Sequence, residues 1–507
     1  TDSVRTYQLP VESYQLPELS EWLSILAGPT NSWLRALLTM PVIVKGSSYI
    51  DNYVRRVFCP RPGQVVTILM DGCQPQSLEV VEADSGFLAL KIERNVDGII
   101  DFNVYHQTVS SVTSLCYSFV YQPQQPLTPI HFVVEGHVDR MCQLYLDTWI
   151  DNADVPADST NVLNANSRLT SDGFVITKEH VRALCQNVRN HSKHYLLPTD
   201  GELFAPMEFL IVSTLPNMLL TLSSSFVTSD LFKILHLYNK FQLVDGATML
   251  KVGDRVSSDL VISGLVSTPL GRRATLFINL YRHAEKIATI EGGFLYRGDF
   301  LDIDKTFEHA LDQRYTIQLA TAIDVTALEA KRWFVYCEDA SARVSPGSVV
   351  EFQLDSYYRF KSESVYSSVS TNGRVFAKFA SGQSVHIANV CFECGISAKD
   401  PVIEYLRRHE TATDSLLFGH DGHPLTPLNE PQWPYTTVPD SNQEYARLSS
   451  DGNPIHINTY IADLAGLPRP ITHGLWTSAA TRAVVERYAA NDEPERIRMY
   501  QANFVGM

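Results

Sequence analysis

The hydrophobic pattern of the first 150 residues changes from helical spacing to strand-like runs. Apolar residues recur every three or four positions at 19–26 and 33–38, which predicts helical segments that pack against a neighbouring domain. From about residue 52 the chain reads mainly as strands separated by turn residues. The clearest of these strands cover 64–70, 86–92 and 114–121. The polar run 154–170 follows, and we interpret it as a linker.

Helical and strand patterns follow one another between residues 174 and 300. Thr177 opens a helix with Val181 and Leu184 on one face, and a second helical stretch begins after Pro206. The strands expected next cover 234–244, 255–263, 273–281 and 287–296, of which the third alternates cleanly between two faces. Helices followed by antiparallel strands predict an α+β domain in which a sheet packs around a helix.

The rest of the chain repeats this alternation and approaches its end with a long helix. We expect an ordered segment at 307–319 and strands at 332–337, 348–354, 374–379 and 385–393. Asn458 is placed to cap a short helix that ends at Gly466. The run from Gly474 to Tyr488 predicts a long helix with a small-residue face, and 496–505 predicts a strand.

Length and charge narrow the possible functions. A chain of 507 residues has room for about three domains with ample core, and 45% apolar with 19% charged residues is typical of a soluble globular protein. The formal net charge of −15 argues against a nucleic-acid or anionic-membrane surface. An acidic partner would therefore need a local basic patch, although most such patches are simply solvated surface. The candidates are Arg272-Arg273, Lys331-Arg332 and Arg407-Arg408.

Neither a targeting segment nor a membrane span is expected. The N-terminus lacks the basic start and apolar run of a signal peptide. The most apolar stretch, 207–222, is interrupted by Glu208 and Pro216, so it does not span a bilayer. We therefore expect a cytoplasmic protein.

The cysteine and histidine spacings do not predict a metal site. Eight cysteines in so long a chain are no disulfide scaffold, and the close pair Cys391 and Cys394 has no second pair to complete a zinc site. His420 and His423 flank Asp421, but no further ligand cluster is evident, so we interpret this segment as a Gly/Pro-rich surface loop. Reduced, partly buried thiols are expected.

One loop near the end of the chain gathers an acid, an amide and an imidazole within six residues. Asp451, Asn453 and His456 can converge on one small substrate because Pro454 tightens the loop between them. His456 can titrate near neutrality and burial can tune Asp451, so the pair suits proton transfer. Gly474 opens the following helix, where its backbone N–H is an unpaired donor that can stabilise a developing negative charge. The spacing predicts an acid–base site.

The other histidines carry no partner pattern. An isolated motif of this length would more often be a turn with a surface histidine, so the loop needs further support. We interpret the remaining imidazoles as structural, with His473 as a helix-start or packing residue; they are His180, His191, His194, His236 and His473.

The loop and the helix start together resemble the signature of the MaoC-like, hydratase-2-type hot-dog dehydratases. That family's pattern reads glycine, aspartate, an aromatic residue, asparagine, proline, an aliphatic residue and histidine. Ser450 and Gly452 depart from it at the glycine and at the aromatic residue, whereas Asp451, Asn453 and His456 are kept. The chemistry therefore survives the comparison, while Gly452 predicts a more mobile loop.

Sequence blocks in order along nearly the whole chain resemble the dehydratase region of the fungal fatty acid synthase beta subunit. They lie at 27–29, 33–36, 237–241, 244–247, 250–254, 294–298 and 502–507. The resemblance implies an α+β fold of tandem hot-dog units, each an antiparallel sheet wrapped around a long helix. Because only one strand follows the helix that starts at Gly474, we expect the last unit to be incomplete and the chain to be a fragment.

The same resemblance implies a division of the chain into four parts. Residues 1–155 would be an N-terminal α/β segment that links to the preceding synthase module. Residues 156–300 would form the first, non-catalytic hot-dog unit of a pseudo-dimer, and 301–430 an inserted non-catalytic unit. Residues 431–507 would form the first half of the catalytic unit.

The activity implied is dehydration of a (3R)-3-hydroxyacyl chain to the trans-2-enoyl product in fatty acid synthesis. Asp451, His456, Asn453 and Gly474 would be the catalytic residues. No cofactor or metal is expected in this stretch, because the substrate is carried on the phosphopantetheine of an acyl carrier protein. The expected partners are that carrier, the synthase alpha subunit and other beta-subunit modules, within a large hetero-oligomer and without nucleic acid or membrane.

Two alternatives remain open. One is a free-standing (R)-specific enoyl-CoA hydratase, which runs the same chemistry in reverse. The order of synthase-like blocks and the unfinished last unit count against it. The other is a non-catalytic hot-dog scaffold, which predicts loss of Asp451 or His456, and both are present.

Overall fold

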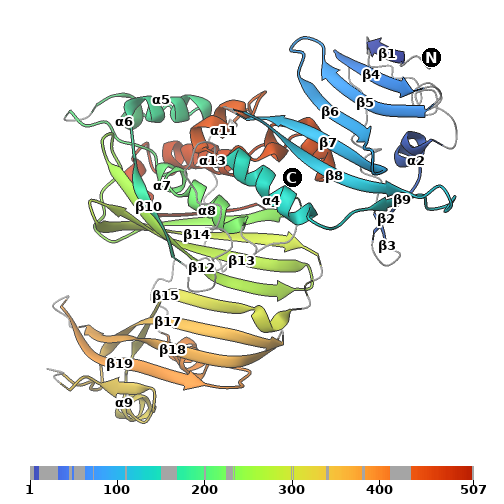
Figure 1. Ribbon diagram of the computed structural model, residues 1–507. Helices are drawn as coiled ribbons and strands as arrows, with labels where there is room; N and C mark the ends of the chain where they lie inside the picture. The colour runs from blue at the N-terminus through green and yellow to red at the C-terminus, as the bar shows by residue number, and fades with distance from the viewer. Residues whose placement is uncertain are drawn as a thin grey trace.

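The chain folds as two large sheets with helices packed between and beside them in a computed structural model (Figure 1). The structure describes residues 5–10, 32–44, 48–50, 63–71, 74–108, 111–149, 168–198, 201–223, 232, 234–298, 300, 302–338, 342–362, 364–378, 383–410 and 436–504. The helix expected at 19–26, the histidine loop at 420–423 and most of the expected linker lie outside these residues. Within the described residues one sheet has nine strands and the other eleven.

The first sheet is built from the N-terminal part of the chain in the order β1-β4-β5-β6-β7-β8-β9-β2-β3. Its strands are β1 (Arg5–Pro10), β2 (Val42–Val44), β3 (Ser48–Ile50), β4 (Gln64–Asp71), β5 (Gln74–Glu82), β6 (Leu88–Arg94), β7 (Ile99–Gln107), β8 (Val112–Tyr121) and β9 (Ile130–Phe132). Helix α2 (Trp33–Thr39) is capped by Ser32, and α4 (His137–Trp149) packs on β8. The predicted helix at 33–38 and the three predicted strands are confirmed, but β5 and β7 were missed.

The second sheet joins the middle of the chain to its end in the order β16-β19-β18-β17-β15-β12-β13-β14-β11-β20, with β10 paired to β12. Its strands are β10 (Arg168–Val175), β11 (Ile234–Leu243), β12 (Arg255–Thr268), β13 (Gly271–Arg282), β14 (Glu285–Arg297), β15 (Phe307–Gln318), β16 (Phe334–Tyr336), β17 (Val349–Ser362), β18 (Val365–Lys378), β19 (Ser384–Cys394) and β20 (Met499–Asn503). The strands predicted from 234 to 393 are confirmed. The linker prediction was wrong at 168–170, where β10 begins.

Helices from two distant parts of the sequence lie close together beside the second sheet (Figure 1). They are α5 (Lys178–Asn187), α6 (Lys193–Leu196), α7 (Phe209–Val212), α8 (Leu215–Leu222), α11 (Gln443–Ser449), α12 (Thr459–Leu464) and α13 (Gly474–Tyr488). Thr177 caps α5 in a capping box and Asn458 caps α12, as the sequence predicts. An antiparallel sheet packed on a long helix confirms the predicted α+β hot-dog class.

The strands β15–β19 continue the second sheet but carry a separate core. Helices α9 (Ala322–Glu329) and α10 (Pro401–His409) complete this part of the fold, and Asp400 caps α10 by accepting from two backbone N–H groups. Val350, Phe352 and Leu406 are fully buried within this separate core. Strands β15–β19 are therefore joined to β12 by backbone hydrogen bonds, but their main apolar cluster is separate from the one that helices α5–α8 and α11–α13 share.

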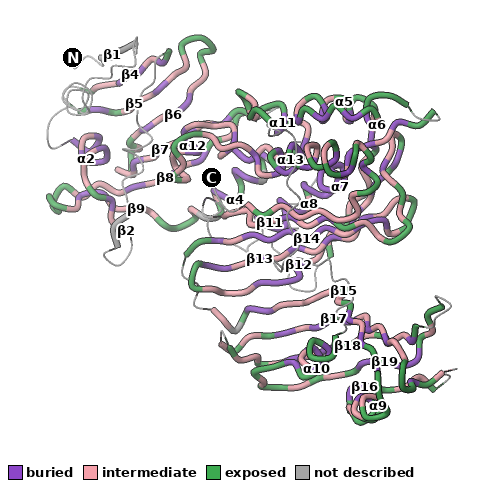
Figure 2. Tube along the Cα trace, turned by 180° about the vertical axis from the view of Figure 1, so that it is seen from behind, coloured by how far each residue is buried: buried purple, intermediate pink, exposed green. Residues whose placement is uncertain are grey.

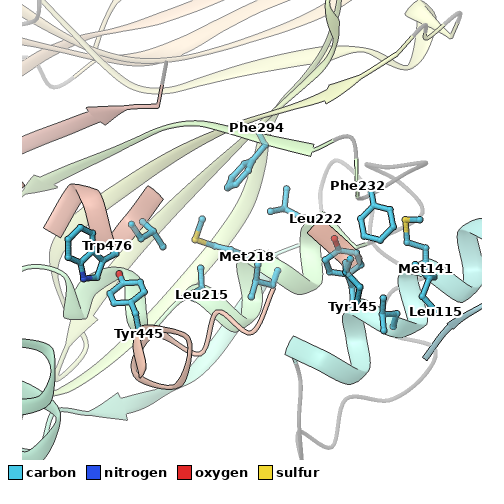
Figure 3. Close-up of a cluster of buried hydrophobic side chains, with 14 of the residues drawn as sticks. Leu115, Met141, Tyr145, Leu215, Met218, Leu222, Phe232, Phe294, Tyr445 and Trp476 are labelled. Atoms are coloured by element: carbon cyan, nitrogen blue, oxygen red, sulfur yellow. The ribbon is translucent and has the colours of Figure 1, made fainter. Parts of the chain in front are cut away.

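A single apolar cluster unites the first sheet with the helices on the second (Figure 3). Trp476 of α13 and Tyr445 of α11 lie at one end of the group drawn there, Met218 of α8 lies between, and Tyr145 of α4 lies toward the other end. Buried positions follow the helix faces that turn toward the strands (Figure 2). Burial of this cluster fixes α13, and hence its first turn, relative to the first sheet.

The structure shows how exposed two of the three candidate basic pairs are. Arg272 is only 6% exposed, bonds to Asp302 and stacks over Phe300. Its side chain is therefore neither a docking patch nor solvated surface, and its choice as a candidate patch was wrong. Arg407 and Arg408 are exposed on α10, as expected of solvated surface.

Among the described residues no helix is long and apolar enough to cross a membrane.

The first sheet also carries a buried histidine beside the candidate loop. His106 of β7 is 4% exposed, and the Asn458 side chain donates to its Nδ1 at 3.4 Å and to the Tyr105 carbonyl at 3.0 Å. Burial lowers the pKa of His106 to about 4. Nearby, the Gln64 side chain donates to the Tyr460 hydroxyl at 2.5 Å, so α12 and its capping residue are held to this sheet by three hydrogen bonds.

Because of the buried His106, we expect the contact between the first sheet and α12 to be sensitive to acid. The unfolded chain takes up the proton near pH 6.5, whereas the folded protein resists it until about pH 4, so folding stability falls as the pH drops through this window. The loss attributable to His106 reaches at most about 3 kcal/mol. Urea unfolding at pH 7.5 and pH 4.5 should therefore show a smaller pH effect in His106→Leu than in the wild type. Equal pH effects would contradict the assignment.

Candidate active site

Three of the four residues predicted to be catalytic, Asp451, Asn453 and His456, lie on one loop between α11 and α12, and the fourth, Gly474, starts α13. Ser450 ends α11 in the left-handed backbone conformation with φ +59°, which glycine adopts most easily. The loop then closes into the 3-10 helix η3 (Pro454–His456), capped by the Asn453 side chain at 3.2 Å from the Ile455 N–H. The conformation explains why the dehydratase pattern has glycine at the position of Ser450.

His456 is buried and its tautomer is fixed by the backbone. Its Nδ1 lies 2.7 Å from the Ile471 carbonyl oxygen, which can only accept, so in the neutral ring Nδ1 carries the proton and Nε2 keeps a free lone pair. Asn442, which the sequence analysis missed, donates to the carbonyls of His456 and Ile471 at 2.9 and 3.0 Å. These bonds hold the loop to the segment that precedes α13.

Burial, with a smaller contribution from the adjacent His473, lowers the pKa of His456 to about 3. The prediction that His456 titrates near neutrality was therefore wrong for the free protein. At pH 7 the ring is therefore neutral and the lone pair on Nε2 is available, but the lowered pKa also makes this imidazole a weaker base than one that titrates near neutrality.

Asp451 and His473 complete the polar cluster. His473 stacks on His456 with ring centroids 3.9 Å apart, and its Nε2 donates to the Asp451 carbonyl at 3.0 Å. The ligand-type atoms of Asp451, His456 and His473 all lie within 4.8 Å of one another. His473 does stand at the helix start as predicted, but without a side-chain capping bond, and it also forms one wall of the site.

Gly474 is the first residue of α13, as predicted. A methyl group at this position would lie 3.1 Å from the ring of Phe504, so glycine allows the backbone to approach that ring. The N–H groups of a first helical turn have no partner within the helix, and this turn lies beside His456 and Asp451. Asp451, Asn453, His456 and Gly474 are thus brought together in one place.

His236 is a neighbour that sequence reasoning treated as structural. It lies on β11, stacks on Phe294 at 4.5 Å and contacts Phe504 at 4.7 Å. Burial lowers its pKa to about 4, and the charge of Asp451 opposes that shift. Its Nε2 is buried without a hydrogen-bond partner. No local pattern signals this position, because its neighbours come from β14 and from the residue after β20.

Gly452 has a packing role rather than the loop mobility suggested by its departure from the family pattern. A Cβ at this position would lie 3.0 Å from the Thr148 carbonyl oxygen of α4, closer than ordinary contact. The aromatic residue of the dehydratase pattern therefore has no room here unless α4 or the loop moves.

This close approach makes Gly452→Ala destabilising. We expect a loss of about 1 to 3 kcal/mol, as for other overpacked positions, with a lower thermal midpoint measured by circular dichroism. Gly395→Ala is the matched control, because nothing lies within 4 Å of its Cβ position and its φ is not positive. Equal midpoints for the two variants would show that α4 does not confine the loop.

The chain matches three family models. They are the fatty acid synthase meander beta sheet domain at residues 13–152, the fatty acid synthase subunit beta insertion domain at 307–406, and the MaoC like domain at 424–507. The last match contains the whole candidate site.

Relatives from fungi align along almost the full chain. The fatty acid synthase subunit beta of Schizosaccharomyces pombe is 31% identical over 99% of this chain, and that of Saccharomyces cerevisiae is 28% identical over 96%. The chain spans about a quarter of the length of these relatives, 24% and 23% respectively. Among solved structures, a MaoC-like dehydratase is 15% identical, covers 69% of this chain with 83% of its own, and has a TM-score of 0.36.

Proposed function

Since the chain belongs to the fungal fatty acid synthase beta-subunit family and carries its MaoC-like domain, we propose that it dehydrates (3R)-3-hydroxyacyl chains bound to an acyl carrier protein. The product would be the trans-2-enoyl chain. The observation that carries the proposal is the neutral, tautomerically fixed His456, whose free Nε2 lies beside Asp451 and the first turn of α13.

The reaction needs a base, a group that orients the hydroxyl and a donor for the thioester oxygen. His456 Nε2 removes the proton from C2, and the electron pair moves to form the double bond as the C3–O bond breaks. Asp451 orients the departing hydroxyl, which leaves as water with the proton that His456 took. The Asn453 amide N–H holds the same oxygen, because its Oδ1 is already bonded to Ile455. The Gly474 N–H stabilises the enolate-like thioester oxygen.

The thioester itself acidifies the proton at C2, so this mechanism uses no organic cofactor. The acyl chain would arrive on the phosphopantetheine arm of the carrier protein. By the same family argument, the alpha subunit and the other beta-subunit modules are the partners we propose.

The test is turnover by the full-length protein that contains this chain. We expect loss of (3R)-3-hydroxybutyryl-carrier protein and formation of the conjugated thioester, followed by its ultraviolet absorbance, with no turnover of the (3S) isomer. Comparison with the coenzyme A thioester separates this proposal from a free-standing hydratase, which would prefer the soluble thioester. If neither thioester reacts, the chain is a scaffold.

A further inference from the structure

The two stacked imidazoles of the site are arranged so that both leave a bare nitrogen. His456 Nδ1 donates to the Ile471 carbonyl at 2.7 Å, and His473 Nε2 donates to the Asp451 carbonyl at 3.0 Å. A backbone carbonyl only accepts, so the proton of each neutral ring is fixed on the bonded nitrogen. The lone pairs of His456 Nε2 and His473 Nδ1 are thereby left free.

His473 Nδ1 is the unusual atom of the pair. The residue is 1% exposed, and this nitrogen is buried without a hydrogen-bond partner in the structure. A buried acceptor without a partner costs free energy unless something binds to it. The mechanism proposed above gives this nitrogen no role.

A carboxylate completes the set. The half-buried side chain of Asp451 supplies an oxygen, and this oxygen and one ring nitrogen of each histidine all lie within 4.8 Å of one another. Two imidazoles and one carboxylate are ligands that Zn²⁺ accepts, and metal-binding imidazoles are typically oriented by a second bond from their other N–H. Zinc bonds of roughly 2.0 to 2.2 Å place tetrahedral ligands roughly 3.3 Å apart, so binding requires the ligand atoms to approach by up to about 1.5 Å. The two stacked rings, whose planes differ by 28°, must also turn so that their lone pairs converge on one ion.

We propose that Asp451, His456 and His473 form a zinc site that inhibits the protein when it is occupied. Zinc on His456 Nε2 takes the lone pair that the proposed reaction needs, and zinc on Asp451 removes the group that orients the hydroxyl. The ion-binding half stands on the geometry alone, whereas the inhibition half rests on the proposed function.

The experiment measures zinc affinity and turnover separately in the full-length protein. Zinc binding is measured by competition with a chromophoric chelator, and Co²⁺ absorption reports whether nitrogen and oxygen ligands surround the ion. Cys337 lies 3.6 Å from His386 and could bind zinc independently. The background therefore carries Cys337→Ser together with His420→Ala and His423→Ala.

His473→Phe keeps an aromatic ring for the stack on His456 but removes the free nitrogen. We expect it to weaken the binding of one zinc ion per chain by at least about 10-fold, since even the loss of a supporting group around a metal costs 10- to 100-fold. Asp451→Asn should weaken it similarly, which covers the case in which the His473 variant does not fold. His180→Phe, at the start of α5, is the control.

The possible outcomes test zinc binding and inhibition by zinc separately. Unchanged zinc affinity in a folded His473→Phe or Asp451→Asn variant would overturn the site. Zinc binding at these residues in a protein that dehydrates no thioester would leave the ion site intact and refute the proposed function. In an active protein, turnover that persists when the site is saturated with zinc would refute the inhibition.

Discussion

Alanine at position 456 should lower dehydration by at least about 100-fold, the lower end of what a general base contributes. The imidazole is neutral and its Nε2 is free, so its removal takes away the group we propose accepts the proton from C2. Turnover of (3R)-3-hydroxybutyryl-carrier protein by the full-length wild type and variant measures the loss. The effect should fall mainly on kcat, because the ring acts in the transition state.

One control variant and one rescue experiment make this result specific. His386→Ala removes an exposed imidazole on β19, far along the sheet from the loop, and should leave turnover unchanged. Added imidazole should partly restore His456→Ala, because the ring leaves a cavity next to Asp451. Wild-type activity in His456→Ala would remove His456 as the base, and a structural collapse would show as lost circular dichroism without rescue.

Strands with alternating burial were predictable, and those that bond through polar side chains were not. β13 has buried residues at every second position, and its period was visible in the sequence. The first three residues of β10 were interpreted as the end of a polar linker. The strand bonds through polar side chains: Ser171 bonds to Ser258 at 3.0 Å and Arg168 pairs with Asp259 at 3.3 Å, both on β12. The missed β7 does alternate, so its signal could have been recognised.

The candidate loop was predictable in part. Asp451, Asn453 and His456 are close in sequence, and their spacing marked them as a candidate acid–base site. The low pKa of His456, by contrast, depends on burial, and the stack with His473 arises only when the start of α13 docks on the loop. The position of His236 likewise depends on packing between distant strands, because its ring contacts Phe294 of β14 and Phe504 after β20. Local sequence fixes which groups can react, while tertiary packing decides their protonation.

A buried ion cluster holds α13 to the first set of helices and gives the largest expected effect on stability. Arg482 is 2% exposed and forms a two-bond pair with Glu208, with both distances 2.5 Å. It also donates to Glu486, which accepts from the Tyr195 hydroxyl at 2.6 Å and from Asn190 at 2.9 Å. The cluster was invisible in the sequence, because its members come from four separate segments.

Replacing Arg482 by methionine should destabilise the protein by about 3 to 5 kcal/mol, because two carboxylates are left buried without their cation. Thermal unfolding followed by circular dichroism should show a midpoint lower by about 3 to 5 °C, because a chain of 507 residues unfolds with an entropy of about 1 kcal/mol per kelvin. Arg487→Met is the control, since Arg487 is exposed on the same helix.

A second substitution distinguishes this electrostatic cause from simple loss of packing. Without the arginine, the carboxylates of Glu208 and Glu486 are buried with no cation beside them. Adding Glu208→Gln to Arg482→Met should restore part of the lost stability, because one uncompensated charge is then gone. A loss that Glu208→Gln does not relieve would show that Arg482 acts through its packing volume. In that case the ion pair with Glu208 would not be what holds α13, and hence the candidate site at its first turn, in place.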